Sequence, residues 1–503
     1  MTPPPSLPAG TAGRFSESSG TGGVGPGSGA DYPVAGVLLP GFVGPTLPDW
    51  LAARLRDGLA GVCLFATNIE SPAQLRALTD AIRDANPLAL IAIDEEGGDV
   101  TRLYSSSGSP YPGNALLGRI NDVEFTTAVA TSVGWELRRA GVNLNFAPDV
   151  DINSNPDNPV IGTRSFGATA DVVSRHTTAW VDGLQQTAVA ASVKHFPGHG
   201  DTATDSHLAL PVVDRSLAEL RVRELVPFDA AIQAGTMTVM TSHILLPQLD
   251  STNPATLSQS ILGGLLRADL GFDGVIVTDA LDMRGASGDT GIPAAAVRAL
   301  AAGADLLCIG TENTDDELAS IEAAIASAVT DGTLTGGRVA AAAERNRGLA
   351  DRLGKLAAER PVPVGGEPAF PLQRAIDAFD VRPAVSVESR RLILALETTA
   401  NIAVGGSPWG LAAAGLEAHQ LRRGDALPDS GPNGQQLVIV GKDNHRHPWV
   451  RELIDLVREQ HPSTLVIDMG WPAPDRRYAD VATFGASRYV GRALAAWLEG
   501  AGK

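Results

Sequence analysis

Short apolar runs alternate with longer amphipathic segments along most of the chain. Each run is rich in β-branched residues and ends in Gly, Asp or His, which is typical of a buried strand followed by a turn. Eight such runs begin at Val34, Gly61, Leu90, Gly141, Val189, Thr238, Gly274 and Asp305. Eight strand and helix units in succession predict an α/β fold, a (β/α)8 TIM barrel over residues 31–355.

The segments between the runs carry signals of helix N-termini. Residues 71–85 (SPAQLRALTDAIRDA) and 216–235 (SLAELRVRELVPFDAAIQAG) both start with Ser, whose hydroxyl caps a helix, and their apolar residues are spaced to form one buried face. The pattern of residues 335–360 (TGGRVAAAAERNRGLADRLGKLAAER) is also helical. We therefore expect helices in all three segments.

A stretch rich in Pro and Gly, PVPVGGEPAFP, predicts a linker over residues 356–385. Further strand-like runs begin at Arg391, Gln436, Thr464 and Val481, and helical patterns occupy 449–460 and 487–500. Alternation without an eightfold repeat predicts a smaller α/β domain over 386–503, an open sheet covered by helices. Residues 1–30, rich in Pro, Gly and Ser, are expected to form a flexible N-terminal tail.

Length and charge narrow the picture further. A chain of 503 residues exceeds one ordinary core, which agrees with two domains. Its net charge is -18 and no block of Lys or Arg interrupts it, so a nucleic acid or an anionic membrane is not an expected partner. The N-terminus lacks the features of a secretory signal, and no run reaches the ~20 apolar residues of a membrane helix. We expect a cytoplasmic protein, of undetermined oligomeric state.

Cysteine and histidine usage gives no strong signal of a metal or a disulfide framework. Cys63 and Cys308 lie within apolar runs, where a buried structural thiol is the expected state. In the segment KDNHRHPW, Asn444, His445 and His447 are interpreted as loop and cap residues rather than as metal ligands. We therefore expect no metal and no organic cofactor.

Polar residues stand at the ends of several predicted barrel strands. They are Asp94, Asp151, Lys194, His195, His243 and Asp279. Functional groups of such barrels lie at the C-terminal ends of the strands and in the loops that follow. A shared polar site is therefore a better explanation than six unrelated core residues.

The segment SVKHFPGHGDTATDSHLALP carries most of the candidate chemistry. It places Asp205 and His207 in a loop rich in Gly, Thr and Ser, a composition that permits movement. The Asp205 carboxylate can hold the imidazole of His207 in one tautomer, which suits proton transfer. Three histidines on an irregular loop containing Pro197 and Gly198 have poor spacing for zinc.

Asp279 ends an apolar strand in GFDGVIVTDALDM, where its side chain would project into the mouth of a barrel. A carboxylate in this position suits the nucleophile of a retaining glycosidase. The alternative is a helix-capping Asp, a role that we assign instead to Asp282.

Four motifs, IDEEGGDVTRL, NFAPDVDINSNPDNPVIGTRSFG, KHFPGHGDTATDSH and VIVTDALDM, occur in the order found in a known family. The chain resembles glycoside hydrolase family 3, and within it the two-domain form of the bacterial β-N-acetylglucosaminidase (β-N-acetylhexosaminidase) branch. The resemblance implies that Asp279 is the nucleophile and that His207, oriented by Asp205, is the acid/base. It also implies which residues hold the hydroxyls of the terminal sugar: Asp94, Arg102, Arg164, Lys194 and His195.

The chain departs from the family pattern at three acids, Glu95, Asp99 and Asp149. Glu95 and Asp99 replace residues that are commonly neutral and basic, and we expect them to alter the rim of the site or the next sugar subsite. Both effects would concern the leaving group more than the chemistry.

Four functions remain open at this point. A retaining exo-β-N-acetylglucosaminidase fits best, acting on a small glycoside or oligosaccharide such as a cell-wall muropeptide or a chitin fragment. Phosphate could replace water as the acceptor, because a neutral imidazole base repels an anion less than a carboxylate does. A β-glucosidase, or a barrel that binds sugar without turning it over, would use the same scaffold.

Overall fold

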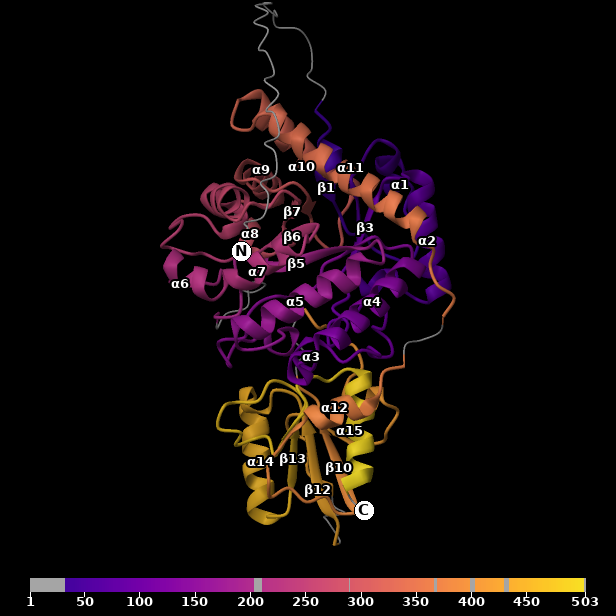
Figure 1. The fold of residues 1–503 in the computed structure, drawn as a ribbon, viewed down its shortest axis with the longest axis vertical. Helices are drawn as coiled ribbons and strands as arrows, with labels where there is room; N and C mark the ends of the chain where they lie inside the picture. The colour runs from indigo at the N-terminus through magenta and orange to yellow at the C-terminus, as the bar shows by residue number, and fades with distance from the viewer. Residues whose placement is uncertain are drawn as a thin grey trace, which may run out of the picture.

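The computed structural model describes residues 32–202, 210–288, 290–365, 369–398, 403–428 and 434–501. In this part of the chain a barrel carries a second α/β domain at one end (Figure 1). The predicted tail at 1–30 and two predicted catalytic residues, Asp205 and His207, lie outside the described residues.

The barrel strands follow one another around the barrel in chain order. Six of them form one sheet in the order β2-β3-β4-β5-β6-β7, and β1 pairs with β8, all in parallel. Backbone hydrogen bonds join the two sheets: Cys63 N donates to Pro40 O at 2.9 Å, and Thr278 N donates to Leu306 O at 2.9 Å. The described strands are β1 (Leu38–Leu39), β2 (Gly61–Leu64), β3 (Leu90–Ile93), β4 (Leu144–Asn145), β5 (Ala190–Phe196), β6 (Thr238–Thr241), β7 (Val275–Val277) and β8 (Leu307–Cys308). The predicted (β/α)8 barrel is confirmed, and each of the eight apolar runs contains one strand.

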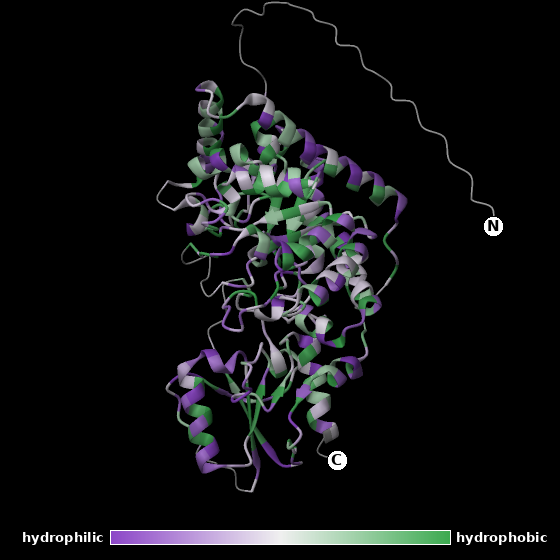
Figure 2. Cartoon of the chain, turned by 60° about the vertical axis from the view of Figure 1, so that its left-hand side comes forward, coloured by the Kyte–Doolittle hydropathy of each residue, from purple (hydrophilic) through white to green (hydrophobic). Residues whose placement is uncertain are grey.

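Burial on both faces explains why these runs are continuously apolar. One cluster of side chains, which includes Leu39, Ala92, Leu144 and Val277, fills the inside of the barrel, and the alternate residues pack outward against the helices. Figure 2 shows this arrangement as hydrophobic strands surrounded by helices with hydrophilic outer turns.

The barrel helices begin where the sequence predicts. Ser71 Oγ accepts a hydrogen bond from Gln74 N at 3.2 Å, and Thr335 caps the long helix α11 in the same way. The helices are α1 (Asp49–Arg56), α2 (Pro72–Ala85), α3 (Asn114–Ile120), α4 (Val123–Arg139), α5 (Ala170–Gln185), α6 (Leu217–Val222), α7 (Leu225–Gln233), α8 (Arg284–Ser287), α9 (Ile292–Ala302), α10 (Asp315–Thr330) and α11 (Gly336–Glu359). The shorter turns are η1 (Val34–Val37), η2 (Ala66–Asn68), η3 (Gly162–Arg164), η4 (Ala255–Leu257) and a π-helix, η5 (Ser260–Asp269).

The predicted helical segment at 216–235 is divided into α6 and α7. Pro227 is the third residue of α7. A proline lacks the backbone N–H and clashes with the carbonyl four residues earlier, so it is tolerated only in the first turn of a helix. The chain accordingly breaks at Arg223, whose φ and ψ are -136° and -81°, and starts a new helix before the proline.

The second domain is an open sheet with helices on both faces. Its strand order is β11-β10-β12-β13-β14-β9, parallel except for the pairing of β9 with β14. The strands are β9 (Asp380–Val381), β10 (Arg391–Leu396), β11 (His419–Leu421), β12 (Gln436–Gly441), β13 (Leu465–Asp468) and β14 (Val481–Ala482). Helix α14 (Pro448–Gln460) covers one face and the helices α12 (Leu372–Ala378) and α15 (Arg488–Ala501) cover the other (Figure 1), while α13 (Gly410–Ala413) and η6 (Asn444–Arg446) are single turns.

The four strands predicted for this domain are present, whereas β9, β11, α12 and α13 were not predicted. The two strands span two and three residues, and only one of these five residues, Leu421, is buried, so they give no apolar run. Asn444 is buried and its amide donates to Ile467 O at 3.2 Å, while His447 is the N-cap residue of α14, which agrees with the loop and cap interpretation.

Contacts between the two domains centre on the loop after β3 and on α3. Leu116 of α3 is buried in the core of the second domain. Asp99 accepts hydrogen bonds from Lys442 Nζ at 2.5 Å and from Ala486 N at 2.9 Å, both of the second domain.

Within the described residues, no helix is long and apolar enough to cross a membrane.

Candidate active site

A cavity of about 440 Å³ opens at the C-terminal ends of the barrel strands. Asp94 directly follows β3, and Asp279 lies just beyond β7. Lys194 and His195 lie near the C-terminal end of β5. The predicted site residues that line the cavity are Asp94, Arg102, Arg164, Lys194, His195 and Asp279. The fold therefore brings together six residues separated by up to 185 positions in the sequence, from Asp94 to Asp279.

A buried carboxylate that the sequence analysis missed, Glu96, organises one wall of this cavity. Arg164 binds it with two hydrogen bonds, from Nε at 3.0 Å and from Nη2 at 2.8 Å. Lys194 Nζ lies 2.8 Å from Glu96 and 2.6 Å from Asp94. Glu96 is the third acid of the run DEEGG at a strand end, which is the only signal the sequence offered.

The opposite charges in this cluster keep one another ionised. Burial alone would raise the pKa of Glu96, but the charges of Arg164 and Lys194 outweigh it and lower that pKa. Burial would likewise lower the pKa of Arg164 and of Lys194, and the neighbouring carboxylates raise both instead. The cluster therefore presents two fully charged cations whose positions are fixed before any ligand enters.

The imidazole of His195 is oriented by Asp151. Its Nδ1 lies 2.7 Å from Asp151 Oδ2, and Asp151 Oδ1 accepts a hydrogen bond from the backbone N of His199 at 2.6 Å. This pairing assigns the proton to Nδ1 and leaves Nε2 as an acceptor, 3.4 Å from Arg164 Nη2. Burial and the nearby Arg164 lower the pKa of His195 to about 4, so the ring is neutral near pH 7.

Asp149, Asp151 and His195 lie close enough to hold a metal ion by distance alone. Three N–H groups already donate to Asp151, two from the backbone and one from His195. The Arg164 guanidinium lies 3.4 Å from Asp149 and would repel a cation at this point. The donor set fits a hydrogen-bond network better than a metal site.

Asp279 faces the cavity from the turn after β7. Its Oδ1 accepts a hydrogen bond from the backbone N of Ala280 at 2.8 Å, and its own N donates to Thr241 Oγ1 at 3.4 Å. His243, another polar residue at a strand end, is buried and its Nε2 lies 2.9 Å from Ala280 O. His243 and Asp151 therefore do not line the cavity but hold residues that do.

The prediction that Asp282 caps a helix is wrong. The N-cap residue of α8 is Met283, and no side chain caps this helix. Asp282 lines the cavity instead, and its Oδ2 accepts a hydrogen bond from Thr311 N at 3.3 Å. The following helix is only one turn long, so the turn is closed by contact with the end of β8 rather than by a cap.

Neither Glu95 nor Asp99 is among the residues that line this cavity. Glu95 is fully buried, and its Oε2 accepts hydrogen bonds from Thr101 Oγ1, Arg102 N and Leu103 N, each at 2.9 Å. Burial raises the pKa of Glu95 to about 7. These two acids shape the loop after β3 and its contact with the second domain.

The second domain reaches the edge of the cavity. Arg102 Nη2 donates to the backbone O of Ala403 at 3.0 Å, and Ala403 is itself part of the cavity wall. Cys63 and Cys308, buried as predicted, form part of the apolar floor together with Phe146 and Met240. The site thus combines a charged wall, an apolar floor and the carboxylates of Asp279 and Asp282 in the turn after β7.

Residues 49–347 match the family model described as glycosyl hydrolase family 3 N-terminal domain, which covers more than half of the chain. The chain belongs to glycosyl hydrolase family 3. The predicted membership, and with it the prediction of a glycoside hydrolase, is confirmed.

Relatives agree with this assignment. The chain is 37% identical over 292 residues to a β-hexosaminidase of Stenotrophomonas maltophilia, covering 56% of this chain and 85% of that one. It is 42% identical over 265 residues to β-hexosaminidase A of Pseudoalteromonas piscicida, a match covering 48% of this chain and 44% of that longer protein. Among solved structures, a family 3 β-N-acetylglucosaminidase of Paenibacillus matches with a TM-score of 0.81 at 31% identity, covering 94% of this chain and 97% of that one.

Because Asp149 is buried beside Asp151, the stability of the folded protein should depend on pH. Burial and the nearby Asp151 raise the pKa of Asp149 to about 7, whereas an Asp in the unfolded chain titrates near about 3.9. The folded state therefore holds this proton more tightly, and its stability falls as pH rises from the lower value through the higher one. The unfolding free energy of the parent minus that of Asp149→Asn should fall by on the order of 2 to 3 kcal/mol between about pH 5 and pH 8.

Urea unfolding at several pH values measures this difference. Asp84→Asn, at an exposed position of α2, is the control for the loss of one carboxylate. The raised pKa of Asp149 would be contradicted if the unfolding free energy of the parent minus that of Asp149→Asn rose with pH. It would also be contradicted if this difference followed that of the control.

Proposed function

We propose that this chain is a retaining β-N-acetylglucosaminidase that removes terminal β-linked N-acetylglucosamine through a covalent glycosyl-enzyme. The observation that carries the proposal is the position of Asp279, a carboxylate just beyond the end of β7 that lines the same cavity as the charged cluster of Glu96, Arg164 and Lys194. The β-hexosaminidase and β-N-acetylglucosaminidase names of the relatives support the choice of an acetylated amino sugar.

In the first step a carboxylate oxygen of Asp279 attacks the anomeric carbon. The bond from this carbon to the glycosidic oxygen breaks, and the oxygen takes a proton from the imidazole of His207. Asp205 would hold that imidazole in one tautomer. The roles of His207 and Asp205 rest on the D-S-H sequence and on the family resemblance.

In the second step His207 accepts a proton from a water molecule, whose oxygen attacks the same carbon. The bond to Asp279 breaks, and N-acetylglucosamine leaves with the configuration it had at the start, because two displacements have taken place. A histidine needs little perturbation for this work, since its reference pKa of about 6.5 is already near neutrality.

The charged wall would bind the sugar hydroxyls. Asp94 and the neutral Nε2 of His195 are acceptors, whereas Arg164 and Lys194 are donors whose charges are already balanced. A hydroxyl buried in such a site must find a partner, and a ligand that lacks it leaves the protein group unpaired, so this arrangement discriminates strongly. The apolar floor near Met240 suits the nonpolar face of the sugar.

Loss of the nucleophile is the most direct test. Asp279→Ala should lower kcat on 4-nitrophenyl N-acetyl-β-D-glucosaminide by at least about 10³-fold, because it removes the carboxylate proposed to form the covalent intermediate. Asp282→Asn changes the next carboxylate of the same cavity and should retain most of the activity. Initial rates at saturating substrate measure both. Full turnover by Asp279→Ala would refute the assignment.

Substrates with different leaving groups test His207. An alkyl glycoside needs protonation of its departing oxygen, whereas 2,4-dinitrophenolate leaves without it. His207→Ala should therefore lose about 10² to 10⁴ of the rate on an alkyl N-acetyl-β-glucosaminide, and less than about 10-fold in the glycosylation step on the dinitrophenyl glycoside. Single-turnover rates on both substrates give the comparison. Equal losses on both would remove His207 from the acid role.

The acceptor is decided by product analysis. Arg164 and Lys194 are already paired with carboxylates, so neither is free to attract phosphate. We expect free N-acetylglucosamine from chitobiose and from a muropeptide, at a rate unchanged by added phosphate, as followed by chromatography of the products. N-acetylglucosamine 1-phosphate formed at an increased rate would instead show a phosphorylase.

A further inference from the structure

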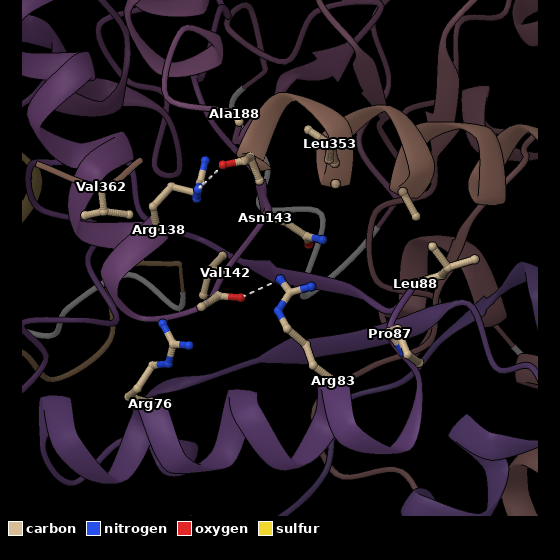
Figure 3. A pocket seen from close by; sticks show the side chains of 14 residues that line it. Arg76, Arg83, Pro87, Leu88, Arg138, Val142, Asn143, Ala188, Leu353 and Val362 are labelled. Atoms are coloured by element: carbon tan, nitrogen blue, oxygen red, sulfur yellow. Dashed lines mark hydrogen bonds between the residues drawn. The ribbon is translucent and has the colours of Figure 1, made fainter. Parts of the chain in front are cut away.

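A second cavity lies at the opposite end of the barrel from Asp279. Its lining residues 87–88 precede β3, residues 141–143 precede β4, and Ala188 precedes β5, so the cavity faces the N-terminal ends of these strands. Its volume is about 300 Å³, and its remaining walls come from α2, α4 and the end of α11 (Figure 3). Nothing in the proposed glycosidase mechanism uses this end of the barrel.

Three arginines line this cavity, two of them without a carboxylate partner. Arg83 Nη2 donates to Gly141 O at 2.8 Å, and Arg138 donates to Thr187 O at 2.6 Å and to Ala357 O at 3.3 Å. In the described ranges no carboxylate lies within salt-bridge distance of either guanidinium. Only Arg76 is paired, with Asp80 at 2.7 Å.

The positive charges of this group work against one another. Burial, followed by the charges of Arg76 and Arg138, lowers the pKa of Arg83. Burial and the neighbouring Arg360 lower that of Arg138. A cluster of partly buried cations is costly unless an anion compensates it.

The arginines are only partly explained by the fold. Arg138 satisfies backbone carbonyls near the end of α11, which is a structural role. Arg83 has one protein acceptor among the described residues, and a neutral side chain could serve that carbonyl equally well. Figure 3 shows the guanidinium groups of Arg76, Arg83 and Arg138 around the same space. The remaining N–H groups of Arg83 are therefore available to a ligand.

The cavity also has accessible apolar side chains in its wall. Leu88 is 39% exposed and lies beside Pro87, Val362 is 37% exposed and lies near Arg138, and Leu353 projects from α11 (Figure 3). Large apolar side chains exposed beside unpaired cations suit a ligand that has an anionic end and an apolar part.

We propose that this cavity binds a small organic anion, whose phosphate or carboxylate group is held by Arg83 and Arg138 and whose apolar part contacts Leu88 and Leu353. The planar fork of a guanidinium matches the oxygens of both anionic groups and binds them with charge-assisted hydrogen bonds. This cavity is separate from the proposed glycoside site, which lies at the other end of the barrel.

Calorimetric titration with phenyl phosphate, benzoate and inorganic phosphate at constant ionic strength tests the proposal. Phenyl phosphate should bind at least about 10-fold more tightly than inorganic phosphate, because its ring removes apolar surface of Leu88 from water. Comparison with benzoate distinguishes a phosphate ligand from a carboxylate one. Arg83→Gln should weaken phenyl phosphate at least about 10-fold, whereas Arg56→Gln, at the exposed end of α1, should leave it unchanged.

Two further variants separate the possible failures. Leu88→Ala, at an exposed position, should weaken phenyl phosphate but not inorganic phosphate; equal effects on both would refute the apolar contact. Arg102→Gln changes the candidate active site. If this variant lost anion binding while Arg83→Gln retained it, the anion would bind in the active-site cavity and the proposal would be overturned. Unchanged binding by Arg83→Gln, with parent-like thermal stability, would also overturn it. Glycosidase turnover by Arg83→Gln reports on the proposed function independently.

Discussion

The buried carboxylate of Glu96 is the constraint on which the candidate site depends. It lies within 3.0 Å of both Arg164 and Lys194, which come from a turn and a strand far apart in the sequence. Removing ions from water costs several kcal/mol each, so none of the three would remain buried and charged without the others. Their mutual attraction therefore fixes the donors of the cavity before any ligand enters, which is the condition for strong discrimination between ligands.

A second layer of contacts holds this cluster in place. Asp151 sets the ring of His195, and His243 holds the turn that carries Asp279. From outside the barrel, Lys442 binds Asp99 in the loop that follows Glu96. The second domain thus supports the loop of the charged wall, although most of the cavity belongs to the barrel.

The cationic side chains at the two ends of the barrel have different kinds of partner. At the C-terminal end, carboxylates balance the charges of Arg164 and Lys194. At the N-terminal end, Arg83 and Arg138 contact only backbone carbonyls in the described part of the chain. Because a carbonyl carries only a partial charge, the second arrangement retains an attraction for anions that the first has lost.

The sequence by itself determined the barrel, because strands buried on both faces must be apolar throughout and their repetition is visible as eight runs. It also placed Asp94, Lys194, His195 and Asp279 in one site, since parallel strands end at the same edge. It could not separate Glu95 from Glu96, two adjacent acids of which one closes a loop and the other pairs with cations. Nor could it show that Asp99 contacts the second domain. Those roles depend on partners tens to hundreds of residues away, and only the tertiary structure decides which charges meet.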